Sequence, residues 1–459
     1  MQSIYYRPGV ILRRYILLPT YLRYIKHSYV LDYYHKLQEQ QWNSLEKNRE
    51  IQARKLYYLL KYASENIPYY KRIVKERNIK ISKDNVFDAL SKFPFLTKKI
   101  IRENFNELYK FRDSKYYLNH TGGSTGEPIE FYQDKEYSDW TIANKFLYNS
   151  WMTWKPGDLI VKLWGAPRDI FCDKKRVMQY LFTLIHGQVV LNSYKMSEEM
   201  MEMYVKIYNQ EKPKLIVAYA ESLFELSNFI EQRGLELWRP EGIITSAGML
   251  YPYMRDQIEK VFHSKVNNRY GSREAGDIAC ECEKHEGLHV NSLLYYLEIV
   301  NSNKNLNLEE NTGEIAVTVL TNYTMPFIRY KIGDIGVVSE CHCTCGREFP
   351  LLKNIEGRTT DMLITSKGER ISGTALTTLM YEITGIARYQ IVQKNLNELE
   401  FYIQPIREDH QESIVKGIQG LMPKLEILFG SRIKLEVKFI SELSSTVTGK
   451  YRYIISNIS

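Results

Sequence analysis

Residues 119–128, with the sequence NHTGGSTGEP, contain three glycines, one serine and two threonines in ten positions. A backbone without Cβ atoms can direct successive N–H groups at one anion, and Thr121, Ser124 and Thr125 would add hydroxyl donors. The spacing differs from that of a P-loop, in which a lysine follows the last glycine. Taken alone, the segment indicates either a phosphate-binding loop or a flexible turn.

Further segments with chemically suitable residues follow in order along the chain. The Gly-Asp pair at 333–334 suits an aspartate that accepts hydrogen bonds from two ribose hydroxyls. Such pairs are also common in ordinary turns, and a lysine such as Lys450 is usually solvated. The ordered set is therefore more informative than any single member. Its members are YGSREAG (270–276), IRYKIGD (328–334), EGRTTD (356–361) and TVTGKYR (446–452).

This ordered set resembles the adenylate-forming superfamily, which includes acyl-CoA synthetases, firefly luciferase and the adenylation domains of peptide synthetases. The resemblance extends from about residue 55 to residue 452 and implies an AMP-forming acid–thiol (CoA) ligase that binds ATP and Mg²⁺. It is strongest to the phenylacetate-CoA ligase branch, including its CapK-type members associated with capsular polysaccharide genes. The segments similar to that branch are LLKYASENIPYYKRI, TGGSTGEP, YGSREAGDIA and LTNYTMPFIRYKIGD.

The resemblance also implies roles for individual residues. Lys450 would bridge the substrate carboxylate and the α-phosphate, Glu274 would help to hold Mg²⁺, and Thr125 would act with them in catalysis. Asp334 would bind the ribose, and Tyr270 would help to frame the adenine. The whole set implied for ATP or AMP binding is Thr121, Gly122, Gly123, Ser124, Thr125, Gly126, Ser246, Ala247, Gly248, Tyr270, Gly271, Ser272, Asp334 and Arg358.

The acid and its acceptor are less well defined. By position in the family, Trp164, Tyr219 and Ala220 are candidates for the acyl pocket, although aromatic residues there are as often ordinary core. No cationic residue stands out in the sequence as a recogniser of an amino-acid or sugar-acid substrate. SAGML (246–250) lacks the glutamate of many relatives, which leaves open whether the acid is aromatic. We expect coenzyme A as the acceptor, with an amine or hydroxyl of a polysaccharide precursor as the alternative.

Five of the six cysteines fall in two short clusters, CECEKHEGLH (280–289) and CHCTCG (341–346). This distribution is unlike a disulfide framework and suits zinc, which takes four thiolate or imidazole ligands in structural sites. Reduced cysteines without a metal are the alternative. By resemblance to relatives with a C-x-x-H loop and a C-x-C-G segment, the expected structural zinc ligands are Cys282, His285, Cys343 and Cys345, with Cys280, Cys341, His289 and His342 as alternatives.

The elements that must position these residues are indicated by hydrophobic periodicity. Residues 30–80 have helical spacing, with a helix ending near Pro68. Apolar runs alternate with amphipathic stretches from about 155 to 300, which indicates an α/β fold with a largely parallel sheet, and 295–340 has the pattern of short antiparallel strands. The last hundred residues have the pattern of a separate α+β domain with one amphipathic helix at 407–424.

We therefore expect an α/β protein with a large N-terminal adenylate-forming domain of mixed sheets and flanking helices, followed by a small, mobile α+β domain. The large domain would occupy residues 1–357, with a helical segment at 1–80, and bind ATP and the acid. The C-terminal lid domain would occupy residues 358–459, with its hinge near Asp361. Domain rotation would gate the two half-reactions.

The N-terminal thirty residues contain basic and apolar side chains and no acidic one before Asp32. They favour a helix packed on its own domain, with solvated arginines, over a helix resting on an acidic membrane. No spanning segment or cleavable signal is indicated, so we expect a cytoplasmic protein, with peripheral contact at the inner membrane face as the alternative. The net charge of +8 would also suit nucleic acid, but glutamates beside the cysteines argue against it. A non-catalytic capsule-assembly scaffold and a homodimer remain open.

Overall fold

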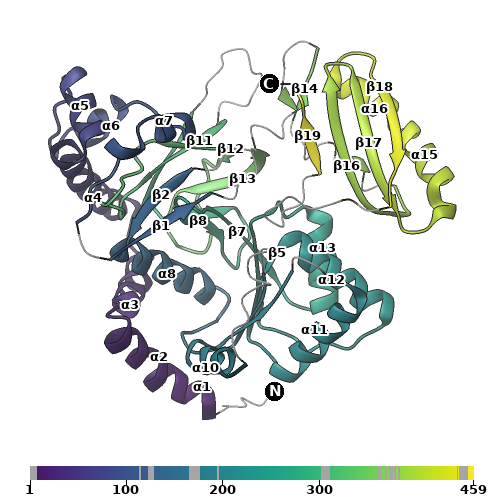
Figure 1. Ribbon diagram of the computed structural model, residues 1–459, viewed down its shortest axis with the longest axis horizontal. Coiled ribbons are helices and arrows are strands. Elements are labelled where there is room, and N and C mark those ends of the chain that lie inside the picture. The colour runs from purple at the N-terminus through teal and green to yellow at the C-terminus, as the bar shows by residue number, and fades with distance from the viewer. Residues whose placement is uncertain are drawn as a thin grey trace.

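The computed structural model describes residues 8–112, 115–121, 129–164, 176–193, 196–300, 311–358, 363–366, 370–371, 376, 379–380, 383–441, 443 and 453–458. These residues form a large mixed sheet with flanking helices and a separate small sheet near the C-terminus (Figure 1). The predicted fold class, α/β with a large mixed-sheet part and a small α+β part, is confirmed.

The large sheet joins a parallel half to an antiparallel half at β7. Strands β4, β3, β5, β6 and β7 are parallel, and the remaining pairs are antiparallel. In spatial order the strands are β10 (Tyr295–Val300), β11 (Thr312–Val319), β12 (Tyr330–Val338), β13 (Leu351–Arg358), β9 (Leu288–Val290), β8 (Gly276–Glu281), β7 (Val266–Ser272), β6 (Gly242–Ser246), β5 (Leu215–Tyr219), β3 (Ile160–Leu163) and β4 (Gln188–Leu191).

A separate hairpin, β1 (Tyr116–His120) and β2 (Glu130–Asp134), lies beside this sheet, and helices flank it on both sides (Figure 1). Pro68 occupies the first turn of a helix and so separates two helices, close to where the sequence predicted a helix end. The longer helices are α3 (Val30–Gln40), α4 (Leu45–Asn66), α5 (Pro68–Glu76), α6 (Val86–Ser91), α7 (Lys98–Glu103), α8 (Lys135–Ser150), α10 (Arg176–His186), α11 (Glu198–Glu211), α12 (Ala220–Arg233) and α13 (Pro252–Phe262).

The parallel half of the sheet separates two hydrophobic cores, because successive side chains of a strand point to opposite faces. On β5, Leu215 and Val217 belong to the core that also holds residues of α3, α4 and α8. Ile216 and Ala218 belong to the core beneath α11, α12 and α13. We call these the α8 face and the α12 face of the sheet. Any charged residue in these strands is thereby assigned to one face.

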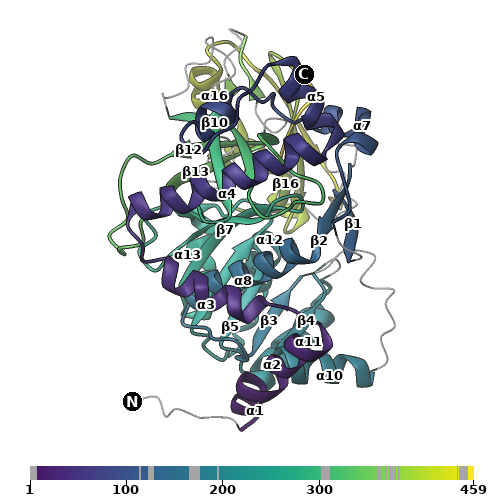
Figure 2. The ribbon, with the colours of Figure 1, turned by 90° about the vertical axis from the view of Figure 1, so that its left-hand side faces the viewer.

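The N-terminal segment forms a helical run that lies beside α10 (Figure 2). In chain order the run consists of α1 (Pro8–Leu12), a π-helical turn (Arg13–Leu17), α2 (Leu18–Thr20) and a second π-helical turn (Tyr21–Ile25). The arginines at its centre are not solvated, contrary to the expectation. Arg13 donates to Leu184 O and Gly157 O, both at 2.9 Å. Arg14 forms an ion pair with Asp158. None of the described helices is long and apolar enough to cross a membrane.

The small part contains a sheet with the order β18 (Lys434–Phe439), β17 (Glu398–Pro405), β16 (Ile386–Asn395) and β19 (Ile454–Ser456). The prediction of a single helix at 407–424 was wrong in the number of helices. The segment contains two helices, α15 (Gln411–Gly420) and α16 (Met422–Phe429), because Pro423 lies in the first turn of the second and has no N–H to continue the first. A short pair, β14 (Leu363–Ile364) and β15 (Arg370–Ile371), forms a separate two-stranded sheet that contacts β16 through hydrogen bonds between Ile364 and Gln393.

The N-terminal run depends on a close approach at Gly157. This residue has φ +94°, and a Cβ atom there would lie 2.8 Å from the Cα of Arg14. We expect Gly157→Ala to lower the free energy of unfolding by about 1–2 kcal/mol through backbone strain, and by a further 1–3 kcal/mol through crowding. Urea titration followed by tryptophan fluorescence would measure this loss.

Gly234→Ala provides the control, because Gly234 has φ +60° and no atom within 4 Å of an added Cβ. Gly234→Ala should therefore lower the free energy of unfolding through backbone strain alone, without a contribution from crowding. Equal losses in the two variants would contradict the importance of the contact between Gly157 and Arg14.

Candidate functional site

The glycine-rich segment predicted to bind phosphate is closed at its base by two hydrogen bonds. Thr121 N donates to Ile129 O, and Ile129 N donates to Thr121 Oγ1, both at 3.0 Å. Strands β1 and β2 pair below this point. The loop is therefore held at its neck by Thr121. The predicted residues of the loop itself, Gly122, Gly123, Ser124, Thr125 and Gly126, lie outside the described residues.

Hydrogen bonds join this hairpin to the second predicted segment, at the turn between β7 and β8. Gln133 Nε2 on β2 donates to Arg273 O at 3.1 Å and to Glu274 O at 3.2 Å. Arg273 Nη1 donates in return to His120 O on β1 at 3.2 Å. The strands of the hairpin and the turn, about 150 residues apart in the chain, therefore lie side by side.

Glu274 connects the same turn to strand β12. Its side chain is only 5% exposed, and its Oε1 accepts a hydrogen bond of 2.7 Å from Tyr330 OH. Its carbonyl accepts a hydrogen bond from Tyr137 OH on α8 at 3.2 Å. A buried carboxylate without a donor would be strongly destabilising, so Tyr330 fixes its position. The sequence analysis did not single out Tyr330 or Gln133, because their partners lie on distant segments.

The third predicted segment meets the second through Tyr270 and Asp334. Tyr270 OH on β7 donates to Asp334 Oδ2 on β12 at 2.9 Å. Arg358 is opposite Asp334 in the pairing of β12 with β13, although its side chain is not described. Gly271 and Ser272 follow Tyr270 at the end of β7. Tyr270, Asp334 and Glu274 therefore lie around one end of the large sheet.

That end is where the parallel strands terminate. Trp164 follows β3, and its ring centre is 4.1 Å from that of Tyr219 at the end of β5. Tyr219 is opposite Ser246 at the end of β6. Ala220, at the start of α12, is fully buried and contributes to the core beneath. Ligands of open α/β sheets bind outside the carboxyl ends of parallel strands, so this edge is a suitable place for a ligand.

The segment after β6 has a constrained backbone. Ala247 has φ +71°, which is unusual for a residue with a side chain. A Cβ atom at Gly248 would lie 2.0 Å from the carboxylate of Glu221, so a larger residue there would require the Glu221 side chain to move. The predicted adenine-framing residues Ser246, Ala247 and Gly248 thus form a fixed turn at the sheet edge.

The C-terminal part meets the large part near this turn. Tyr453 packs at right angles to Tyr251, with 5.9 Å between ring centres, and Arg388 on β16 forms a 2.6 Å ion pair with Glu225 on α12. The predicted catalytic Lys450 and the predicted hinge Asp361 lie outside the described residues. Tyr453 follows Lys450 by three residues, and its partner Tyr251 follows Gly248 by three residues. The contact therefore joins the neighbourhoods of these two predicted site segments.

The cysteine clusters converge beneath the antiparallel half of the sheet. Cys282, His289, Cys343 and Cys345 offer ligand atoms that all lie within 4.8 Å of one another. Cys282 Sγ is 3.5 Å from Cys343 Sγ, and Cys345 Sγ is 3.5 Å from His289 Nε2. Sulfurs bound to one tetrahedral zinc at 2.3 Å would be separated by about 3.8 Å. The donor set and its spacing therefore fit zinc.

His285, one of the four expected ligands, is not part of this group. Its Nδ1 lies 3.3 Å from Arg255 Nη1 and 3.5 Å from Glu281 Oε2, so it belongs to a neighbouring ion-pair network. His289 occupies the fourth position instead, since it pairs with Leu351 across β9 and β13. In the group of four, His289 thus replaces the expected His285, and His289 was one of the alternatives in the sequence analysis.

Other groups support the cluster from outside. The backbone N–H groups of Lys284 and Arg347 each lie 3.4 Å from a cysteine sulfur, Cys282 and Cys345 respectively. Such donors stabilise negative charge on sulfur. The ring of Trp151 packs at 5.5 Å from that of His289. Burial lowers the pKa of His289 to about 4, so its imidazole is neutral at pH 7.

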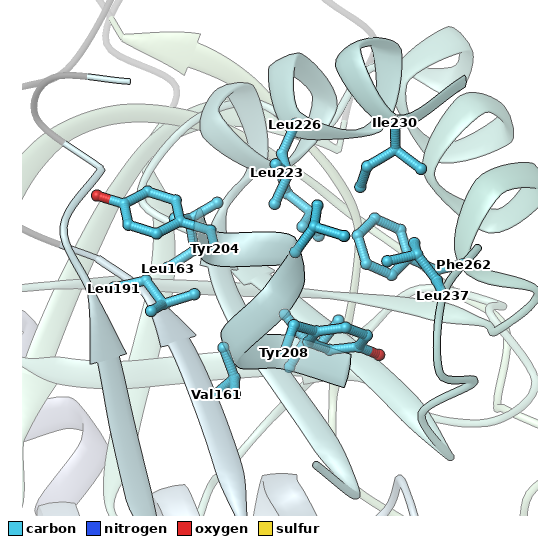
Figure 3. Close-up of a pocket in the computed structure, with 12 residues that line it drawn as sticks. Val161, Leu163, Leu191, Tyr204, Tyr208, Leu223, Leu226, Ile230, Leu237 and Phe262 are labelled. Carbon is cyan, nitrogen blue, oxygen red and sulfur yellow. The ribbon is translucent and has the colours of Figure 1, made fainter. Parts of the chain in front are cut away.

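An apolar pocket lies on the α12 face, and none of these groups lines it (Figure 3). Aliphatic and aromatic side chains line it, among them Val161, Leu223 and Phe262. The hydroxyls of Tyr204 and Tyr208 point out of it toward the backbone oxygens of Asn192 and Trp238. No charged side chain lines this pocket, so it belongs to core packing and offers no catalytic group.

Comparison with known proteins gives matches along the whole chain. The family model of the CapK C-terminal domain matches residues 363–457. The chain is 25% identical to Protein CapK of Staphylococcus aureus, with 95% of this chain and 94% of CapK covered. It is 25% identical to a phenylacetate-coenzyme A ligase of Thermus thermophilus, with 78% of this chain and 82% of the ligase covered.

Solved structures agree on the fold. A 2-hydroxyisobutyryl-CoA ligase in its postadenylation state superposes with a TM-score of 0.72 and 18% identity over 91% of each chain. A structure of fatty acyl-adenylate ligases from E. coli and L. pneumophila gives a TM-score of 0.52 and 15% identity, over 73% of this chain and 67% of that one. The predicted resemblance and the predicted enzyme class are both confirmed: the chain resembles CapK and the phenylacetate-coenzyme A ligases in sequence, and it has the fold of adenylate-forming ligases.

Proposed function

We propose that the chain activates a carboxylic acid with ATP and then transfers the acyl group to coenzyme A. The main support is the meeting of the neck residue Thr121, Glu274, Tyr270 and Asp334 at the carboxyl end of the parallel strands. These residues come from three separate segments that sequence analysis assigned to nucleotide binding. The relatives named phenylacetate-coenzyme A ligase are enzymes of this kind.

In the first half-reaction, a carboxylate oxygen attacks the α-phosphorus of ATP, and the bond from that phosphorus to the bridging oxygen of the β-phosphate breaks. The products are an acyl-adenylate and pyrophosphate. Asp334 would hold the ribose hydroxyls, and Tyr270 would orient Asp334 through its hydrogen bond. The positioning of substrates and charge stabilisation lower the barrier, so no protein nucleophile is required.

Mg²⁺ fits this arrangement. It usually keeps several waters and binds through one or two carboxylates together with phosphate oxygens, and Glu274 supplies one carboxylate. Tyr330 donates to only one of the two carboxylate oxygens, Oε1, in the hydrogen bonds described here. A bound Mg²⁺ would offset negative charge on the phosphates. Lys450 would add positive charge beside the α-phosphate.

In the second half-reaction, the thiol of coenzyme A loses its proton, its sulfur attacks the acyl carbon, and AMP leaves. The small domain would rotate about Asp361 between the two steps. The side chains of Arg388 and Glu225, which join the two domains, are 39% and 37% exposed. Exposed ion pairs contribute only about 0–1 kcal/mol, so this contact would not prevent rotation.

The acceptor distinguishes this proposal from its nearest alternative. The similarity to CapK over 95% of the chain also suits transfer to an amine or hydroxyl of a capsular polysaccharide precursor. Both versions share the adenylation step. A scaffold without catalysis would perform neither step.

We expect ATP–pyrophosphate exchange with a suitable acid, measured over aromatic, aliphatic, amino and sugar acids. Lys450→Ala should lower its rate by about 100-fold or more, because a charge that stabilises the transition state is lost. Asp334→Asn should raise the KM for ATP. Lys434→Ala, which removes an exposed lysine of the same domain, is the matched control.

Full exchange activity in Lys450→Ala would contradict the role of that residue. Absence of exchange with every acid class would favour the scaffold. Release of AMP that depends on added coenzyme A would identify the acceptor.

We further propose that Cys282, His289, Cys343 and Cys345 bind a structural zinc ion. Four protein ligands leave no open coordination position, so the metal would have no direct part in the reaction. Cys282 and His289 flank the loop between β8 and β9, and the other two cysteines lie in the connection that precedes β13. A zinc ion would therefore fasten the loop between β8 and β9 to the connection between β12 and β13, and β12 contains Asp334.

We expect purified protein to contain about one zinc ion per chain by plasma mass spectrometry. Cys343→Ser should remove most of this zinc and lower the midpoint of thermal unfolding. Cys341→Ser is the control, because this exposed cysteine is outside the group of four. Equal zinc content in the two variants would contradict the site.

We also propose that the N-terminal run contacts the surface of an acidic membrane. Basic residues Arg23, Lys26 and His27 are exposed at the end of the run, where they would meet anionic lipid headgroups. Apolar side chains that soluble proteins usually bury are also exposed there. These residues, which we call the N-terminal face, are Ile11, Leu12, Tyr15, Ile16, Tyr24 and Ile25, with exposed fractions of 42% to 73%.

We expect the protein to sediment with vesicles of phosphatidylcholine and phosphatidylserine, and less with phosphatidylcholine alone. The double variant Ile16→Glu, Tyr24→Glu should reduce binding by about 10-fold or more, since it adds negative charge and removes buried apolar area. Ile427→Glu is the control, because Ile427 is 83% exposed on the small domain. Equal binding by the double variant and the control would contradict the proposal.

A further inference from the structure

Lys162 lies in the parallel sheet where an apolar residue would be expected. It is the third residue of β3, in the sequence IVKL, and its strand neighbours Val161 and Leu163 face the α12 core. By alternation, Lys162 points to the α8 face, the same side as Trp164 two residues later. It therefore lies one pleat below the aromatic pair of Trp164 and Tyr219.

Three other charged side chains surround Lys162 on this face. Lys145 is on α8, Arg269 is on β7 and Asp277 is on β8, and each acts electrostatically on Lys162. We call these four residues the Lys162 cluster. With three cations and one carboxylate, it has a local excess of two positive charges. His186 on α10 also lies within electrostatic reach of Lys162.

The cluster does not satisfy its own charges. Arg269 is 6% exposed, and its Nε has no hydrogen-bond partner. Its Nη1 lies 3.4 Å from Asp277 Oδ2, too poorly directed for a hydrogen bond. Among the described residues, the side-chain ammonium groups of Lys162 and Lys145 have no hydrogen bond or ion pair. Burial and the two neighbouring cations lower the pKa of Lys162 to about 7.

Lys55 provides a comparison, because it is a half-buried lysine whose contacts are all within the protein. Lys55 on α4 is half-buried, like Lys162, and its pKa is likewise lowered to about 7 by desolvation. However, its Nζ donates to Leu293 O at 2.7 Å and lies 4.5 Å from the ring centre of Trp140. Lys55 therefore has partners within the protein, whereas Arg269 Nε and Asp277 Oδ2 of the Lys162 cluster have no hydrogen-bond partner in the described part of the chain.

The cluster lies next to the candidate acyl site. Arg269 is opposite Ser246 in the sheet and directly precedes Tyr270, so it lies beneath the proposed adenine-framing residues. Lys145 is one helical turn after Thr141, whose methyl group would lie 2.9 Å from a Cβ at Gly276. The four side chains thus occupy the space between α8 and the strand ends that hold Tyr219 and Ser246.

We propose that the Lys162 cluster binds a second anionic group on the acid that this enzyme activates. The substrate class would be a carboxylic acid with a further carboxylate or phosphate at its other end. One carboxylate would meet ATP at the strand ends, and the distal anion would pair with Lys162, Lys145 and Arg269. This inference rests on the proposed adenylation function, and it names the cationic recogniser that the sequence analysis did not find.

The test compares acids that differ only in a distal carboxylate. The probes are phenylacetate with 4-carboxyphenylacetate, and hexanoate with adipate, measured by titration calorimetry in the presence of AMP and by ATP–pyrophosphate exchange. We expect the dicarboxylate of each pair to bind about 10-fold or more tightly than its monocarboxylate. Phosphate-bearing acids of similar length would distinguish the two kinds of distal anion.

Lys162→Met should abolish this preference and leave the affinity for monocarboxylates unchanged or higher. Lys145→Met should reduce it. Lys55→Met is the matched control, since it also removes a half-buried lysine with a lowered pKa but lies outside the cluster. Equal binding of the two acids of each pair, no binding of any dicarboxylate or phosphate-bearing acid, or a preference that survives in Lys162→Met would overturn the inference. A binding preference without any exchange would instead reject the adenylation function.

The pH dependence provides a second readout that requires no turnover. A cation whose pKa is lowered in the folded state destabilises that state most below the folded pKa, and this cost disappears as pH rises toward the unfolded value. Lys162→Met should therefore raise the unfolding midpoint most below pH 7 and little near pH 10.5. In the unsubstituted protein, dicarboxylate affinity should fall between pH 6 and pH 8. Affinity independent of pH would overturn the inference.

Discussion

A carboxylate buried in a protein interior needs a hydrogen-bond donor, and the arrangement at Glu274 follows from this requirement. Its side-chain oxygen accepts from Tyr330 on β12, and its backbone oxygen accepts from Gln133 on β2 and Tyr137 on α8. Each donor comes from a different element. The same contacts that satisfy one residue therefore hold the β1–β2 hairpin, the β7–β8 turn and strand β12 at one edge of the sheet. Movement of any one element would leave polar groups unpaired.

The sequence predicted the fold well where local patterns were sufficient. The antiparallel strands predicted at 295–340 are β10, β11 and β12. The alternation of strands and helices predicted from about 155 is the parallel half of the sheet as far as β7, after which β8 and β9 are antiparallel. Periodicity records which face of an element is buried, so long regular segments can be recognised without their partners. One helix was predicted at 407–424 because the amphipathic pattern continues through Pro423. The structure has two helices there, because proline has no N–H to donate to the preceding turn.

The candidate site was predictable only as a set of segments. Motif spacing favoured His285, but the pairing of β9 with β13 places His289 beside Cys345. Tyr330 and Glu274 are 56 positions apart, and no local pattern indicates their hydrogen bond. Lys162 was also missed, because the charged residues near it lie on distant segments and the rest of IVKL has the composition of an ordinary core strand. Cross-strand register is a property of the folded sheet, and sequence spacing does not record it.

The two faces of the parallel sheet differ in chemistry, and this difference bears on function. The α12 face is lined by apolar side chains that pack against one another. The α8 face contains Lys162, Arg269 and Asp277 within the same strands. Burial of unpaired charge lowers stability, and replacement of such groups by apolar ones is often stabilising. Groups that weaken the folded state without pairing inside it are typical of binding sites, where an external partner completes them.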